Sequence, residues 1–205
     1  RSHTSTIPLP SGRSTRDTPR AATPASLASR GIGLGRAVGE RLLAMRPPHL
    51  AHSLLAACAR LDVPCTVHVA VGTDIVHMHP RCDGAAVGAT THRDFRLLAA
   101  VVADLGDGGV YLNVGSAVLL PEVFLKALTL SRNLGYRVQN FVTANLDFIQ
   151  HYRPPQNVVR RPVAKGGRGY ALTGHHELLV PFLAAILIEG SDGEVPSTDR
   201  RAPSA

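Results

Sequence analysis

Apolar residues along the middle of the chain change from helical to extended spacing and back several times. In some segments they recur three and four positions apart, as on one face of a helix. Between these segments lie short runs of β-branched and other apolar residues, bounded by glycine or polar residues, as in strands buried on both faces. The pattern predicts helices over residues 50–61, 94–105, 121–135 and 177–189, and strands over 63–71, 108–117, 136–145 and 157–163.

This alternation of strands and helices predicts an α/β fold, Rossmann-like, with a mostly parallel sheet and helices on both faces. Residues 31–189 form the predicted domain. The flanking segments 1–30 and 190–205 are rich in small and polar residues without an apolar period. Burial cannot repay the entropy of ordering such segments, so both are expected to be disordered.

Composition restricts the environment and the partners. The chain has 205 residues, 44% of them hydrophobic, which is enough for one well-buried domain. Its three cysteines, Cys58, Cys65 and Cys82, form no CxxC pair, which favours a reduced compartment and a cytoplasmic location. No apolar run reaches the roughly 18–20 residues of a membrane span, so no membrane association is expected.

The charge favours small anionic ligands over nucleic acid. The net charge is +7, and residues 1–30 alone contain five arginines and one aspartate. Aromatic residues make up only 4% of the chain and tryptophan is absent, whereas single-stranded nucleic acids are bound by stacking on aromatic side chains. The glycines of GIGLG (31–35) follow no predicted strand and therefore form no dinucleotide fingerprint. We read that segment as a loop leading into a helix.

Three predicted strands lead directly into loops of small and polar residues. Ligands of parallel α/β sheets bind beyond the carboxyl ends of the strands, so these loops are expected to lie side by side at one binding edge. Gly115 and Ser116 stand between a strand and a helix start, where free amides and the helix dipole favour an anion. Residues 164–177, rich in glycine, are a candidate lid over that ligand. The candidate ligand-binding residues of the first two loops are Gly72, Thr73, Asp74, Gly115 and Ser116.

Histidines near these loops supply candidate chemistry. Imidazole exchanges protons near neutral pH, which makes His77 and His175, together with Asp74, the catalytic candidates. An alternative is a metal-dependent enzyme, although the chain lacks the HExxH and CxxC spacings that identify metal sites. The ligands of that alternative would come from Asp74, His77, His79, His151, His175 and His176.

Three stretches together resemble the deoxyhypusine synthase family. They are GTD (72–74), GGVYLNVGSAVLLPEVFLKALTLSRNLG (108–135) and TAN (143–145) followed by Asp147. That family has an NAD-binding Rossmann-like fold and transfers an aminobutyl group from spermidine. The resemblance implies a nicotinamide cofactor near Asp74, Gly115, Ser116, Thr143 and Ala144.

One departure from the family bears on its activity. His175 stands where the family has the lysine that forms an imine, so the resemblance implies a transferase whose chemistry is altered or lost. A third alternative is a non-catalytic fragment that forms homo-oligomers, or that binds nucleic acid through its arginine-rich first 30 residues.

Overall fold

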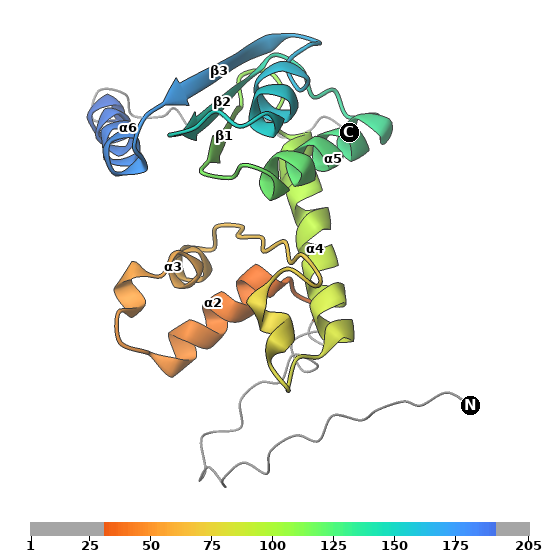
Figure 1. The fold of residues 1–205 in the computed structure, drawn as a ribbon, viewed down its shortest axis with the longest axis vertical. Helices are drawn as coiled ribbons and strands as arrows, with labels where there is room; N and C mark the ends of the chain where they lie inside the picture. Colours follow the sequence, from red (N-terminus) through yellow and green to blue (C-terminus); the bar gives the residue numbers. More distant parts are fainter. Residues whose placement is uncertain (1–30, 192–205) are drawn as a thin grey trace, which may run out of the picture.

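A computed structural model describes residues 31–191, and within them it shows a mixed α/β fold (Figure 1). The predictions of disorder for residues 1–30 and for most of 190–205 fall outside the described residues. The predicted fold class is confirmed, because a parallel sheet flanked by helices forms one half of the molecule. The other half consists of helices and loops. No helix in residues 31–191 has both the length and the apolar character needed to cross a membrane.

The sheet contains three parallel strands in sequence order. They are β1 (Val110–Val114), β2 (Phe141–Asp147) and β3 (Gly167–Thr173). Helix α5 (Leu119–Asn133) connects β1 to β2, as the apolar pattern predicts. Val114 pairs with Leu146, and Leu146 pairs with Leu172, so the three carboxyl ends lie level with one another.

The main apolar core lies between one face of this sheet, α5 and the second half of α4 (Gly84–Ala103). Tyr111 of β1 stacks on Phe124 of α5 with 3.5 Å between ring centroids, and Phe124 is 1% exposed. The remaining buried core residues are Ala99, Val102, Ala127, Leu128, Val138 and Phe141. Burial of such side chains is the main source of stability in this half.

Helix α4 links the two halves and is longer than predicted, because it begins at Gly84 rather than near residue 94. The Asp83 carboxylate accepts hydrogen bonds from the amides of Ala85 and Ala86 and so caps its first turn. Its first half contacts α2 (Leu34–Met45), which packs closely on α3 (Leu54–Leu61). A single 3₁₀ turn (Leu50–His52) precedes α3. Helix α2 confirms that GIGLG leads into a helix.

The predicted strand at 63–71 does not form. The segment is extended but has no neighbouring strand among the described residues, and it runs along α4 instead. The Val67 amide donates to the Asp94 carboxylate, the Val69 amide donates to Thr91 Oγ1, and that hydroxyl donates to the Val67 carbonyl. Side chains of α4 thus take the place of a paired strand, which explains why β-branched residues here do not produce one.

Two predictions near the C-terminus are also wrong. Residues 157–163 form no strand, because a π-helical turn (Pro155–Arg160) begins at the two prolines and occupies most of that range. The glycine-rich segment 164–177 is no lid, because half of it is strand β3, paired along its whole length with β2, and α6 begins at His176. Gly169 is required there, since a Cβ would overlap the Val159 carbonyl. The predicted closing helix is confirmed as α6 (His176–Ser191).

Candidate functional site

The carboxyl edge of the sheet brings three strand ends into direct contact. Gly115, immediately after β1, has a φ of +67° and donates its amide hydrogen to the Leu146 carbonyl at 3.0 Å. Asp147 is the last residue of β2, and its carbonyl accepts a hydrogen bond from Gly174 after β3 at 3.2 Å. The residues that follow β1, β2 and β3 therefore share one edge, as expected for a parallel sheet.

The loop from Gly115 into α5 presents free backbone amides. The amides of Ala117, Val118 and Leu119 have no acceptor among residues 31–191, whereas the Leu120 amide is capped by Ser116 Oγ at 3.1 Å. Free amides at the start of a 15-residue helix carry a partial positive charge and attract anions.

The Asn113 side chain holds this loop in place by a hydrogen bond. It is 2% exposed, and its Nδ2 donates both to the Ser116 carbonyl at 2.9 Å and to Asn145 Oδ1 at 2.6 Å. Its Oδ1 is buried and has no partner among the described residues. Buried acceptors without a partner are rare in proteins, so Asn113 Oδ1 is a candidate contact for a bound molecule at this loop. Asn113 could not be recognised from the sequence, because an asparagine within an apolar strand forms no motif.

The two adjacent histidines at this edge have different environments. The His176 ring packs against Gly115, where a Cβ would lie 3.2 Å from Cε1, and its Nε2 lies 3.0 Å from the Leu146 carbonyl oxygen. His175 is exposed and stacks on Phe148 with 4.4 Å between ring centroids. His176 therefore supports the edge, while His175, the predicted residue, remains accessible together with Phe148.

Asp147 contributes the one carboxylate at the end of β2. Its Oδ1 accepts a hydrogen bond from the Phe148 amide at 2.8 Å, and its Oδ2 has no partner among the described residues. The edge thus combines an anion-attracting loop after β1 with a hydrogen-bond acceptor after β2. These two groups are adjacent because the strands that carry them are paired.

Thr143 and Ala144 do not reach the edge. Both are buried within β2, and Thr143 is 0% exposed and donates its hydroxyl hydrogen to the Val158 carbonyl at 2.8 Å. Thr143 therefore binds the π-helical turn that covers the sheet. The structure gives both residues a place in the packing rather than at a ligand surface.

The loop that begins at Gly72 lies away from this edge. Figure 1 shows the segment between α3 and α4 beside the first turns of α4, at the end of that helix remote from the sheet. Asp74 Oδ2 accepts from the Ala70 amide at 2.7 Å, and His77 Nδ1 lies 3.8 Å from Cys82 Sγ within a 3₁₀ turn (Ile75–Met78). The structure therefore does not place Gly72, Thr73, Asp74 and His77 beside Gly115, because residues 63–71 do not join the sheet.

The alternative of a metal site gains no geometric support. Among residues 31–191, no three side chains of histidine, cysteine, aspartate or glutamate are grouped so that they could hold a metal ion. The six candidate ligands are divided between the loop before α4, which has Asp74, His77 and His79, and the C-terminal edge of the sheet.

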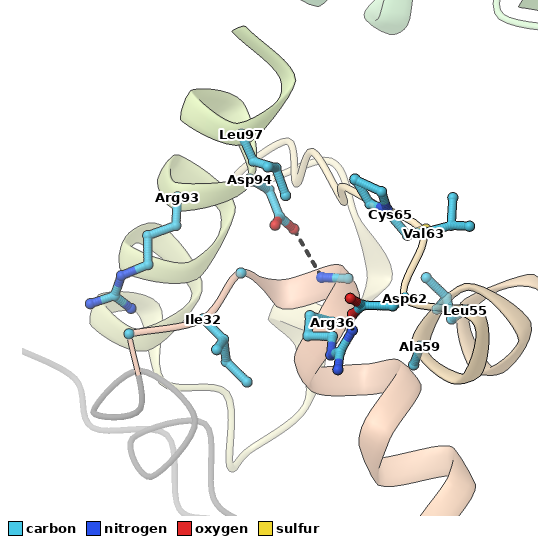
Figure 2. Close-up of a pocket in the computed structure, with 14 residues that line it drawn as sticks. Ile32, Arg36, Leu55, Ala59, Asp62, Val63, Cys65, Arg93, Asp94 and Leu97 are labelled. Atoms are coloured by element: carbon cyan, nitrogen blue, oxygen red, sulfur yellow. Dashed lines mark hydrogen bonds and ion pairs between the residues drawn. The ribbon is translucent and has the colours of Figure 1, made fainter. Parts of the chain in front are cut away.

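A second concave site, which no sequence pattern predicted, lies in the helical half (Figure 2). It is a cavity of about 490 Å³ between the start of α2, α3, residues 62–65 and α4. Asp94 on α4 is 0% exposed and directs its carboxylate at the start of α2, where Oδ2 accepts from the Gly35 amide at 2.9 Å. The signal for this residue in the sequence is slight, since Asp94 is only one aspartate at the head of an apolar run.

Comparison with known proteins assigns no family to the chain. No family model matches it, and no curated protein or solved structure matches it either.

Proposed function

We propose that the carboxyl edge of the sheet binds a nucleotide, with NAD as the expected ligand, in a domain similar to deoxyhypusine synthase. The observation that carries the proposal is the adjacency of Gly115 and Asp147 at the ends of paired parallel strands joined by α5. A strand, a helix and a second parallel strand form the nucleotide-binding unit of Rossmann folds, with phosphate at the first loop and an acidic residue after the second strand.

The phosphate would lie against the loop after β1. The free amides of Ala117, Val118 and Leu119 supply hydrogen-bond donors, and the dipole of α5 supplies favourable charge. Gly115 has a positive φ that glycine adopts readily, which lets the backbone turn sharply out of β1.

The ribose would be recognised by Asp147. Its unpaired Oδ2 is a suitable acceptor for a ribose hydroxyl, as the acidic residue after the second strand is in dinucleotide-binding folds. The exposed pair of Phe148 and His175 lies next to it and offers a flat surface for an aromatic ring.

The resemblance of residues 108–135 and 143–145 to deoxyhypusine synthase supports NAD over other nucleotides. Imidazole cannot form the imine that the lysine of that family forms, so His175 would not carry out the transfer by that route. We therefore propose cofactor binding at this edge, with His175 as the accessible acid or base beside it.

Isothermal titration with NAD and with inorganic pyrophosphate tests the two halves of this site separately. Val118→Glu places a carboxylate among the free amides and should weaken both ligands at least ten-fold. Asp147→Asn keeps the bond to the Phe148 amide but removes the charge, and should weaken NAD about ten-fold while leaving pyrophosphate unchanged. The matched control is Asp107→Asn, at the opposite end of the same sheet. If wild-type protein binds neither ligand at millimolar concentration, the proposal is wrong.

The outer edge of β1 favours self-association as a second function. No described strand pairs with the outer edge of β1, which exposes Val110, Leu112 and Val114 and carries no charged residue. Such an edge is a template for another strand. We propose that a second copy pairs its own β1 there about a two-fold axis.

Sedimentation velocity at several protein concentrations checks this pairing. The wild-type chain should sediment as a dimer, and Leu112→Lys should convert it to a monomer. Ile75→Lys changes an even more exposed apolar residue outside the sheet and should leave the dimer intact. A monomeric wild-type protein, or a dimer that persists in Leu112→Lys, would show that β1 does not mediate assembly.

A further inference from the structure

Asp94 has an unmet hydrogen-bond acceptor beside the cavity of the helical half. Its Oδ2 accepts from the Gly35 and Val67 amides at 2.9 Å and 2.8 Å, but its Oδ1 is buried and has no donor among residues 31–191. No described lysine, arginine or histidine forms an ion pair with it. The two amides and the dipole of α2 stabilise part of the Asp94 charge, but Oδ1 accepts no hydrogen bond.

The space next to Asp94 is shaped for a small molecule. Its volume of about 490 Å³ falls within the range of about 300–1,000 Å³ typical of ligand pockets. The side chains of Ile32, Leu55, Ala59, Val63 and Leu97 make much of the wall apolar. Burial, and then the neighbouring Cys58, raise the pKa of the Cys65 thiol, so this wall residue remains uncharged at neutral pH.

The arginines at the rim of the cavity do not pair with the Asp94 carboxylate. Arg36 is engaged by Glu40 at 2.8 Å and by Asp62 at 2.6 Å. Figure 2 shows the Arg93 guanidinium directed away from Asp94. Gly33 borders Oδ1, because a Cβ at this position would overlap that oxygen.

We propose that this cavity binds a small apolar molecule that carries a protonated amine. The ammonium group donates to Asp94 Oδ1 and supplies the positive charge that the described residues do not, while the apolar body contacts Leu55, Val63 and Leu97. A charge-assisted hydrogen bond to a buried oxygen is worth more than a neutral one, so the site discriminates between an amine and an alcohol of the same shape. This site is separate from the proposed nucleotide site, and neither depends on the other.

Benzylamine and benzyl alcohol are matched probes for the full chain, because they differ only in the polar group. We expect benzylamine to bind saturably at millimolar concentration in a titration followed by NMR, and benzyl alcohol to bind about ten-fold more weakly. Leu97→Trp fills the cavity from a position that is 39% exposed and therefore tolerates a larger side chain, and it should weaken benzylamine about ten-fold. Val101→Trp, one turn along α4 at 48% exposed and outside the cavity, is the control and should bind normally.

Asp94→Asn keeps an acceptor for the Gly35 amide and removes the charge, so it should abolish the preference for the amine. Circular dichroism verifies that this variant stays folded, and the Leu97→Trp comparison stands if it does not. Equal binding of the amine and the alcohol by the wild-type protein would overturn the proposal. So would unchanged affinity in Leu97→Trp, or no benzylamine binding at all.

Discussion

The two halves of the molecule are held together by different interactions. In the sheet half, large side chains such as Phe124, Phe141 and Leu128 are essentially fully buried. In the helical half, the buried apolar residues before position 95 are Ala37, Ala56, Ala86 and Val87, none larger than valine. Glycines replace large side chains there, since a Cβ at Gly35 or Gly39 would overlap a backbone carbonyl of the neighbouring segment. The helical half therefore gains less from apolar burial and depends more on polar contacts.

Asp94 is the centre of those polar contacts. Its one carboxylate joins α4 to the start of α2 and to the extended segment at Val67. A domain built in this way has room for a cavity beside the carboxylate, whereas the sheet half fills its interior with aromatic and branched side chains. The two proposed sites differ in the same way. The nucleotide site lies at the edge of a sheet with a packed apolar core, and the amine site lies in a cavity between helices with small side chains.

The largest effect should come from Phe124→Ala. Removing a buried phenyl ring that stacks on Tyr111 should lower the free energy of unfolding by about 3–5 kcal/mol. Chemical denaturation measures the total, and hydrogen exchange of the Val142 amide, which is bonded to the Gly109 carbonyl, reports on the sheet half. A loss below about 1 kcal/mol would mean that this half does not depend on its aromatic core.

Asp94→Ala should produce the next largest effect and should affect the other half. It leaves the Gly35 and Val67 amides without an acceptor. Each buried donor left unpaired costs about 1–3 kcal/mol, and the Val67 bond is only partly buried and costs less, so we expect a loss of about 2–4 kcal/mol. Exchange of those two amides should accelerate more than exchange of Val142. If all three amides accelerate equally, the halves unfold as one unit and the contrast between them is wrong.

The sequence predicted β1 and α5 of the sheet half better than it predicted β3 or the extended segment at 63–71. The period of 3.6 in 121–135 and the Gly-bounded apolar run at 108–117 reflect burial against a core, and both elements form at β1 and α5. The run at 63–71 has the same β-branched composition, but its hydrogen-bond partners are Thr91 and Asp94 on a helix. β-Branched composition therefore predicts that a segment is extended, but it does not predict whether its hydrogen-bond partner is a strand or a helix.

The candidate sites show the same limit. Gly115 and Ser116 were predicted because small and polar residues follow a strand there, and His175 because imidazole exchanges protons near neutral pH; the structure brings their segments together at the carboxyl edge of the sheet. Asp74 and His77 met the same criteria, but their segment is not part of the sheet. Asn113 and Asp94 could not be selected, since their importance lies in unpaired oxygen atoms that only the packed structure defines.

A smaller effect is expected from Asp83→Ala at the start of α4. The Asp83 carboxylate caps the helix at the Ala85 and Ala86 amides, with distances of 3.0 Å and 3.1 Å, and loss of such a cap costs about 1 kcal/mol. The loss should loosen the first turns of α4 and the contact with α2, and leave the end of α4 that packs on α5 unchanged. Asp83→Asn retains the cap and is the control. A uniform loss of protection along α4 would show that the helix transmits the change between the halves.

The smallest effect concerns the pH dependence of the helical half through His68. This ring is half-buried and bonded to Thr66 Oγ1 at 3.0 Å, and burial lowers its pKa. The unfolded chain therefore binds a proton more readily than the folded chain does, so the contribution of His68 to stability is complete above about pH 6.5 and is lost as the pH falls towards the lower folded value. Denaturation at pH 7 and pH 5 should show a drop that is smaller in His68→Asn. His92→Asn, an exposed histidine on α4, should keep the full drop. An identical drop in both variants would assign the acid sensitivity to other groups.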